Sequence, residues 1–407
     1  MKKNYLLIAA AAALFAACAE TDNFKEIDTE DVLIGFETFH EKATKAAVSA
    51  GSDLTSANGG FGVFGYNHDD SRTVSSGSIN MTTAGTSNVF NNVKVWYENA
   101  STLTKGFTYD VPKYWNKNKY YTFFAYAPWN ESTVTLAETT GKFTRTDVQS
   151  LQSTNATTTV TVGSNDRTQY TTANETSAID YLFAVCVSQQ KYAATNQSTY
   201  TGYQKTVGFT FSHILSKLNV TVQAKDESTG HEYKGVKDIQ VTSLNIENLP
   251  NAAANVTYTQ TATDDVAGDF TPAHYTTNLN IISGTNALTA GPLYVLDGGA
   301  NGTPVTAPTT YINQAFHYWV APNSPDPDDN AHNKYKLNIN YTINYVDNVS
   351  DSFTRTIDLS TESAAFTTMA QNYIYNITVT IGLDQIYFNV DAINGWATPQ
   401  NTNVEID

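Results

Sequence analysis

Strict alternation of apolar and polar residues is the main pattern along this chain. It is clearest over residues 335–345, where apolar residues hold the odd positions and polar residues hold the even ones. Neighbouring side chains of a β-strand point to opposite faces, so a period of two predicts a strand with one buried face. The same pattern predicts strands at 93–97, 218–222 and 373–381, with a hairpin partner at 386–390. A further strand is predicted at 120–126, where a run of mainly aromatic residues is stopped by Pro128.

Polar stretches rich in Asn, Gly, Ser and Thr separate these strands, and we interpret them as loops. They cover 68–88, 137–178, 188–205, 226–236, 251–274, 284–310 and 322–333. No segment of twelve residues has a helical period, so the sequence predicts an all-β fold of antiparallel β-sandwiches. A chain of 407 residues favours two domains. We place them at 46–213 and 214–407, with a boundary region over 205–220.

The first eighteen residues have the pattern of an export signal. Lys2 and Lys3 precede an apolar run over 6–17, which is too short to span a bilayer. We interpret residues 1–17 as a signal peptide. The run ends in Leu-Phe-Ala-Ala-Cys, which is similar to a bacterial lipobox and predicts lipidation of Cys18. The alternative is an ordinary signal peptide with an incidental cysteine.

The net charge limits which partners the chain can bind, and the cysteine content limits whether a disulfide can stabilise it. The net charge of −16 argues against nucleic acid and anionic lipid as partners. The chain has two cysteines, so a lipidated Cys18 would leave Cys186 without an intrachain disulfide partner. Cys186 lies in the apolar run 180–187, which predicts a buried, unreactive thiol.

Motifs for catalysis or metal binding are absent from the sequence. None of the seven histidines forms a closely spaced pair, and no nucleophile elbow or phosphate loop occurs. The acidic loop 326–330 lacks the glycine and closing glutamate of an EF-hand, so a solvated turn is favoured over a calcium site. His213 lies among apolar residues and is predicted to be structural. We therefore expect no enzyme activity and no cofactor.

Several segments, taken in order, resemble the fimbrillin family of Bacteroides-type bacteria, whose members build surface fimbriae. They are Ile-Gly-Phe at 34–36, Phe-Gly-Val-Phe at 61–64, the 114–128 segment, Phe-Thr-Phe-Ser-His at 209–213 with the residues to 218, and 372–396. The resemblance covers nearly the whole chain. It implies two transthyretin-like β-sandwich domains and export as an outer-membrane lipoprotein at the cell surface.

The resemblance also implies removal of an N-terminal segment by an Arg- or Lys-specific protease. Residues 18–45 would form a tether and a removable strand whose apolar side chains are Val32, Ile34 and Phe36. The cleaved bond would join Lys45 to Ala46, with Lys42 as a rival position. An ordinary lysine in a linker is the alternative.

Polymerisation by strand donation is a further implication of the resemblance, with other fimbrial subunits as partners. The candidate donor is the C-terminal tail containing Trp396, Val404 and Ile406. The alternative is that 386–396 only completes its own domain. The favoured role is a stalk subunit that supports adhesion. An anchor subunit, a tip subunit and a glycan-binding outer-membrane lipoprotein are the alternatives. The last would use Trp and Tyr side chains as sugar platforms, but Trp96, Trp115, Trp129 and Trp319 lie in or next to apolar strand runs, so most of them are predicted to be core residues.

Overall fold

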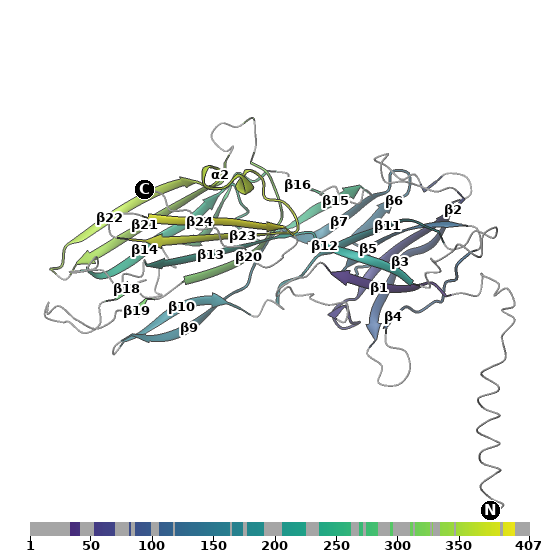
Figure 1. The fold of residues 1–407 in the computed structure, drawn as a ribbon, viewed down its shortest axis with the longest axis horizontal. Coiled ribbons are helices and arrows are strands. Elements are labelled where there is room, and N and C mark those ends of the chain that lie inside the picture. The colour runs from purple at the N-terminus through teal and green to yellow at the C-terminus, as the bar shows by residue number, and fades with distance from the viewer. Residues whose placement is uncertain are drawn as a thin grey trace, which may run out of the picture.

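The structure is a computed structural model of the chain. It describes residues 33–40, 53–69, 81–82, 86–98, 106–116, 119–162, 165–173, 177–190, 206–224, 236–261, 268–271, 274–283, 294–295, 310–311, 314–325, 328, 334–345, 347–382 and 386–394. These residues form an elongated body with two halves along its long axis (Figure 1). The all-β prediction is confirmed, because the helical elements among the described residues are the four-residue α2 (Leu359–Glu362) and η5 (Ala364–Thr367).

A seven-stranded sheet forms most of the N-terminal half, in the order β1-β12-β11-β5-β2-β3-β4. Its strands are β1 (Gly35–His40), β2 (Phe61–His68), β3 (Ser87–Glu98), β4 (Gly106–Thr108), β5 (Tyr120–Ala127), β11 (Leu182–Gln190) and β12 (Thr206–His213). A four-stranded sheet, in the order β16-β15-β7-β6, packs against it. Its strands are β6 (Val134–Ala137), β7 (Lys142–Gln149), β15 (Asn255–Thr261) and β16 (Asp269–Thr271).

The central strands of the seven-stranded sheet are buried on both faces. Along β5, Phe124 and Tyr126 face the core shared with the four-stranded sheet, while Phe123 and Ala125 face a second core. A strand covered on both sides has no polar face, so its sequence is a continuous apolar run. This explains why residues 120–126 do not alternate as 335–345 do.

Two sheets packed face to face form the C-terminal half around a single core. One sheet contains β8 (Leu151–Ser153), β13 (Ser216–Ala224), β20 (Gln314–Val320), β23 (Tyr373–Ile381) and β24 (Ile386–Asn394). The other contains β14 (Val236–Glu247), β17 (Asn278–Ile282), β18 (Tyr294–Val295), β19 (Thr310–Tyr311), β21 (Lys336–Tyr345) and β22 (Ser350–Asp358). A separate hairpin joins β9 (Asn155–Val162) to β10 (Asn165–Thr172).

The predicted strands are present, but several others were missed, among them the apolar strands β2, β14 and β20 and the strands rich in Thr and Asn. The hairpin of β23 and β24 and the long strand β21 are confirmed. The loop predictions for 137–178 and 251–274 are wrong, because these stretches contain β7 to β10 and β15 with β16. Thr is β-branched and favours strands even in polar segments.

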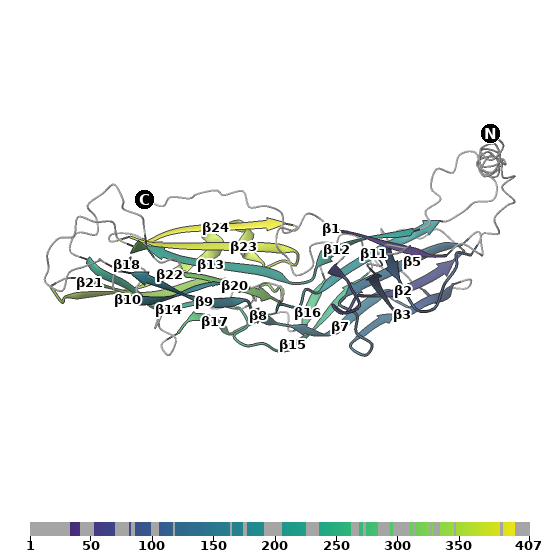
Figure 2. The same cartoon turned by 90° about the horizontal axis from the view of Figure 1, so that it is seen from below.

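Strand pairing crosses the position at which we divided the chain. β15 pairs with β7, and β20 pairs with β8, so each half receives strands from the other side of residue 213. Figure 2 shows β7 and β15 together in the middle of the molecule. The boundary at 213/214 and the two transthyretin-like domains remain predictions.

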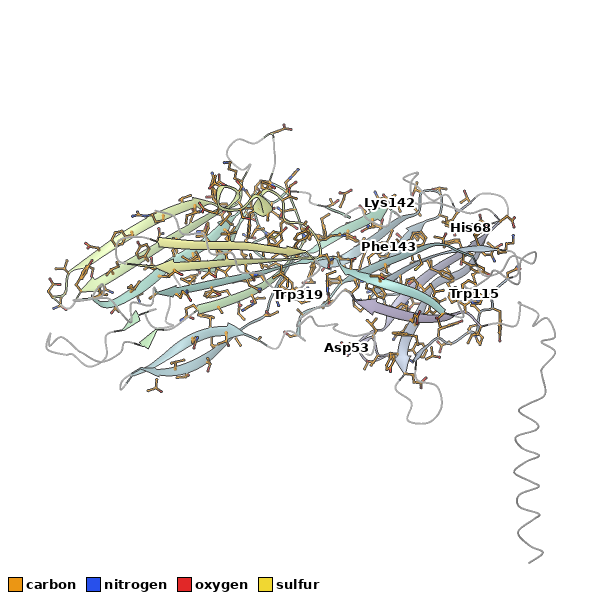
Figure 3. All side chains as sticks on the ribbon, in the orientation of Figure 1. Asp53, His68, Trp115, Lys142, Phe143 and Trp319 are labelled. Atoms are coloured by element: carbon orange, nitrogen blue, oxygen red, sulfur yellow. The ribbon has the colours of Figure 1, made fainter. Side chains whose placement is uncertain are left out.

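A shared core joins the two halves. Trp319 of β20 is fully buried in it with Phe143 of β7, and Figure 3 shows Trp319 midway along the body. Arg145 is buried against Tyr126 and Tyr181 of the same core, and its Nε lies 2.6 Å from Asp147 Oδ1. Burial alone would raise the pKa of Asp147, but the hydrogen bond and charge of Arg145 lower it below its usual value.

Candidate functional site

The first described strand, β1, lies at the edge of the seven-stranded sheet. It runs parallel to β12, in a register from Gly35 opposite Thr206 to His40 opposite Phe211. The other strand pairs of this sheet are antiparallel. The parallel pairing follows from chain geometry, because parallel strands need a long connection and β1 is separated from β12 by the whole N-terminal half.

The segment after β4 holds the start of β1 from its other side. The Ile34 backbone N–H donates to the Lys113 carbonyl at 2.9 Å, and the Tyr109 hydroxyl donates to the Ile34 carbonyl at 2.7 Å. Burial raises the pKa of Tyr109 to about 12, although its hydrogen bond with the Lys113 backbone opposes the rise. The hydroxyl therefore keeps its proton at neutral pH and remains a donor.

Phe36 anchors β1 in the core beneath it. Its ring stacks on Phe209 of β12 at a centroid distance of 5.7 Å. It also meets Phe90 at 5.4 Å and Phe123 at 6.0 Å, in edge-to-face arrangements. Ile34 is fully buried in the same core, whereas Leu33 remains exposed. Aromatic pairs of this kind add about 0.5–1.5 kcal/mol each beyond the apolar area they bury.

The core under β1 is built from distant parts of the chain. Four strands and one loop supply its main side chains, which are Phe61, Val63, Phe90, Val95, Trp115, Phe123, Val207, Phe209 and Phe211. Removing β1 would uncover the rings that Phe36 contacts and the outer edge of β12. The arrangement can therefore hold one extended, apolar strand by side-chain burial and main-chain pairing.

The predicted site residues divide into described and undescribed ones. The core-strand prediction for Ile34 and Phe36 is confirmed, since both are buried. The remaining predicted residues lie outside the described part of the chain: Cys18, Val32, Lys42, Lys45, Ala46, Trp396, Val404 and Ile406. Sequence reasoning missed Tyr109 and Lys113, since a clamp formed by one hydroxyl and one carbonyl has no local signal.

Other candidates from the sequence proved structural. His213 Nδ1 lies 2.8 Å from Asp180 Oδ1 and both side chains are buried, which confirms the structural role. Cys186 is half-buried rather than buried, and its thiol donates to the Gly208 carbonyl at 2.8 Å. Trp115 and Trp319 are buried in cores, as expected, while Trp96 and Trp129 are half-buried.

Within the part of the chain that the structure describes, no group of three or more metal-binding side chains occurs. Of the acidic loop 326–330, only Asp328 is described. Among the same described residues, no helix has both the length and the apolar character needed to cross a bilayer.

Comparisons with known proteins identify a family. The sequence profile of a family described as fimbrillin-like matches residues 44–396. No curated protein matches the chain.

The solved structures that match cover most of the chain at low identity. A fimbrial protein from Bacteroides vulgatus is 17% identical, with a TM-score of 0.42 over 90% of this chain and 99% of its own. A candidate cell adhesion protein from Bacteroides uniformis is 14% identical, with a TM-score of 0.41 over 90% and 99%. The tip fimbrial protein Mfa3 from Porphyromonas gingivalis is 8% identical, with a TM-score of 0.29 over 89% and 98%.

Proposed function

Because the chain belongs to the fimbrillin-like family, we propose that it is a stalk subunit of cell-surface fimbriae. We propose that its subunits polymerise by strand exchange, in which a strand of another subunit takes the place of β1 in the groove beside β12. The observation that carries the proposal is the position of β1. It is an edge strand, it pairs with a segment far away in sequence, and its contacts are with aromatic side chains of a continuous core.

Proteolysis between β1 and β2 is the proposed activating step. Lys45, and its rival Lys42, lie between His40 at the end of β1 and Asp53, where the described chain resumes. A cut after either lysine would leave β1 attached by non-covalent contacts alone. We propose Lys45–Ala46 as the cleaved bond and an Arg- or Lys-specific surface protease as the enzyme.

Loss of β1 would leave an unstable groove. Burial of Ile34 and Phe36 is worth about 1.5–3 kcal/mol each, and the pairing with β12 would also be lost. An equivalent strand from a second subunit would restore both contributions. Filling each groove from the next subunit is a head-to-tail contact that does not close on itself, and it therefore produces a filament.

The proposed donor is the C-terminal tail with Trp396, Val404 and Ile406, which follows β24 in the sequence. β24 itself pairs with β23 along nine residues and completes its own sheet. The donor therefore begins after Asn394. Export would place the chain on the outer membrane through lipid on Cys18, until cleavage releases it into the fimbria.

Limited trypsin digestion of residues 19–407 tests the proposal. We expect one early cut after Lys45 by N-terminal sequencing, followed by ladders of oligomers and filaments in electron micrographs. Lys45→Gln should abolish both cut and filaments, whereas the matched control Lys42→Gln should leave them unchanged. Deletion of residues 395–407 should permit the cut and prevent the filaments.

The contrary outcomes point to specific alternatives. A chain that resists the cut would be an anchor subunit that retains β1. A chain that is cut and stays monomeric would be a tip subunit, or a surface lipoprotein whose glycan binding could be measured on the monomer. Loss of filaments in Lys42→Gln but not in Lys45→Gln would move the cleavage position.

A further inference from the structure

The outer edge of the C-terminal half carries a self-complementary strand. β22 ends its sheet in the order β19-β18-β14-β21-β22 and follows β21 through a tight turn. Most of its side chains are exposed. Figure 1 places β22 at the margin of the C-terminal half, far from β1.

Two hydrogen bonds fix which backbone groups of β22 point outward. At one end the Tyr345 N–H donates to the Val349 carbonyl at 2.9 Å, and at the other the Leu359 N–H donates to the Tyr335 carbonyl at 3.0 Å. Both bonds belong to the register that places Tyr341 opposite Phe353. In an antiparallel pair these bonds alternate, so odd-numbered residues of β22 bond to β21. The N–H and C=O groups of 350, 352, 354 and 356 therefore point away from the sheet.

The side chains of this strand are symmetric in chemistry about Phe353. On the odd-numbered face the order is Val349, Asp351, Phe353, Arg355, Ile357: apolar, acidic, aromatic, basic, apolar. The even-numbered positions 350, 352, 354 and 356 are all Ser or Thr. An antiparallel second copy centred on Phe353 would oppose Val to Ile, Asp to Arg, Phe to Phe and hydroxyl to hydroxyl. Each of these is a favourable cross-strand pair.

We propose that β22 pairs edge to edge with β22 of a second copy of this chain, about a two-fold axis through Phe353. In this register Ser352 opposes Thr354 of the second copy, so the outward backbone groups bond to each other. Phe353 and Asp351 then fall in the non-hydrogen-bonded pairs, where opposing side chains come closest. The contact is isologous and joins two sheets into one.

Neighbouring registers are chemically worse. A shift of the axis to Thr354 would oppose Asp351 to Ile357, and a shift to Ser352 would oppose Asp351 to Phe353. Both would bury a carboxylate against an apolar side chain without a partner. Charges on an edge strand commonly prevent pairing. Here the two charges have opposite signs and lie at equal distances from Phe353, so self-pairing brings unlike charges together.

One existing contact must rearrange. Arg355 Nη1 now donates to the Thr354 carbonyl at 3.1 Å, and its guanidinium lies 5.8 Å from the Phe353 ring. In the pair, the Ser352 N–H of the second copy replaces the guanidinium at this carbonyl. The guanidinium is then available to Asp351 of the second copy.

An edge contact along one strand is small, so we expect weak association between isolated chains. Many copies aligned along neighbouring filaments would strengthen it by avidity. That lateral role depends on the proposed fimbrial function, whereas pairing itself does not depend on cleavage. The pairing is therefore tested on the uncut chain, where failure of strand exchange has no influence.

Charge reversal at β22 provides the central test, using residues 19–407 and analytical ultracentrifugation over a concentration series. The parent chain should dimerise. Arg355→Asp should weaken dimerisation by about tenfold or more, because two unlike pairs become like pairs. Combining Asp351→Arg with Arg355→Asp should restore it. Lys142→Asp is the matched control: it makes the same charge change on the exposed end of β7 and should leave dimerisation unchanged.

Cysteine cross-linking on cells that express the full chain tests the register. Phe353→Cys should give a disulfide-linked dimer under mild oxidation, above the background of the parent with Cys18 and Cys186. Thr354→Cys is the neighbouring control and should stay at background. Cross-linking at 354 instead of 353 would overturn the proposed axis.

Two further results would overturn the proposal. One is a parent chain that remains monomeric up to about 1 mM, the weak limit of specific association. The other is a full chain that is monomeric while a chain ending at Asn394 dimerises, since the last residues of the same molecule would then cover the edge. Failure of the double charge reversal to restore pairing would equally exclude this interface.

Discussion

β1 and β22 both lie at the edge of a sheet, but they are held there in opposite ways. β1 is parallel to β12, which is distant in sequence, and it buries Ile34 and Phe36 in an aromatic core. β22 is antiparallel to its sequence neighbour β21, and most of its side chains are exposed. β1 is held mainly by the burial of its side chains in the core, whereas β22 is held by its pairing with β21 and by the turn that joins the two strands.

This difference is the basis for proposing strand exchange at β1 and addition of a further strand at β22. A strand held by side chains from distant segments can be replaced by another strand with similar side chains. A strand held by a hairpin stays with its own chain, but its outward-pointing backbone groups can accept a further strand. Under the two proposals above, the β1 edge would serve growth along the filament and the β22 edge would serve contact beside it.

The largest effect should come from removing the anchor of β1. Phe36→Ala should lower the free energy of unfolding by about 3–5 kcal/mol, because the ring is buried among five other aromatic rings. Urea unfolding of residues 19–407 measures it. Leu33→Ala, at a side chain that is 48% exposed, is the control and should change stability by less than about 0.5 kcal/mol. Equal losses in both variants would contradict the anchoring role.

The corresponding change on β22 should cost much less. Phe353→Ala removes a half-buried ring stacked on Tyr341 at 4.9 Å, so we expect a loss of about 1–2 kcal/mol. The same urea experiment measures it. A loss as large as that of Phe36→Ala would remove the contrast between the two edges.

Loss of the Tyr109 hydrogen bond to β1 should destabilise that strand locally. Tyr109→Phe removes the donor to the Ile34 carbonyl and should cost about 1 kcal/mol. Hydrogen exchange should then accelerate at the amides of Gly35–His40 and not at those of Ser350–Asp358. Tyr114→Phe, at an exposed position of the same segment, is the control. Uniform acceleration across both strands would show global destabilisation instead of a clamp.

The smallest expected effect is a loss of local stability at the end of β22 in acid. Burial alone would raise the pKa of Asp358 at the end of β22, but hydrogen bonds from Lys334 and Ser360 lower it overall. A lowered folded-state pKa adds stability above the unfolded value of about 4, and this stability is lost as the pH falls through the folded value. Between pH 5 and pH 2, exchange should therefore rise at the end of β22, by an amount worth about 0.5–1 kcal/mol.

Asp358→Asn is the control for the acid effect. The amide keeps an oxygen for the Ser360 N–H at the start of α2 but has no charge for Lys334. The variant should thus lack the pH-dependent step at this site. Persistence of the step in Asp358→Asn would assign it to another carboxylate, such as Asp147, whose pKa is also lowered.

Alternation in the sequence predicted much of the local structure, and polar strands were where it failed. Tyr335, Leu337 and Ile339 were assigned to a buried face and are buried. In β15, Val256, Tyr258 and Gln260 alternate inward as well, but flanking Thr and Asn led us to interpret the segment as a loop. The polar composition of the segment led to the loop prediction, and the polar Gln260 at a buried position made the alternation harder to recognise.

The candidate site was only half predictable. The spacing of Ile34 and Phe36 predicted a core strand. The hydrogen bond from Tyr109 to Ile34, in contrast, forms because the segment after β4 folds back over β1. Nothing in the sequence around 106–113 specifies that contact. The symmetry of β22 about Phe353 is visible in the sequence, but its meaning depends on the outward direction of the backbone groups of its even-numbered residues.

The sequence by itself determined that the chain is all-β, where some of the strands with an apolar face lie, and which side chains of those strands point inward. These follow from a period of two and from residue preferences, which are local properties. Only the tertiary structure decided that β1 lies parallel to β12, that β7 pairs with β15 across the middle of the molecule, and that β22 is left at an edge. Pairing partners depend on which distant segments can bury their apolar faces together, and many pairings satisfy the same local pattern.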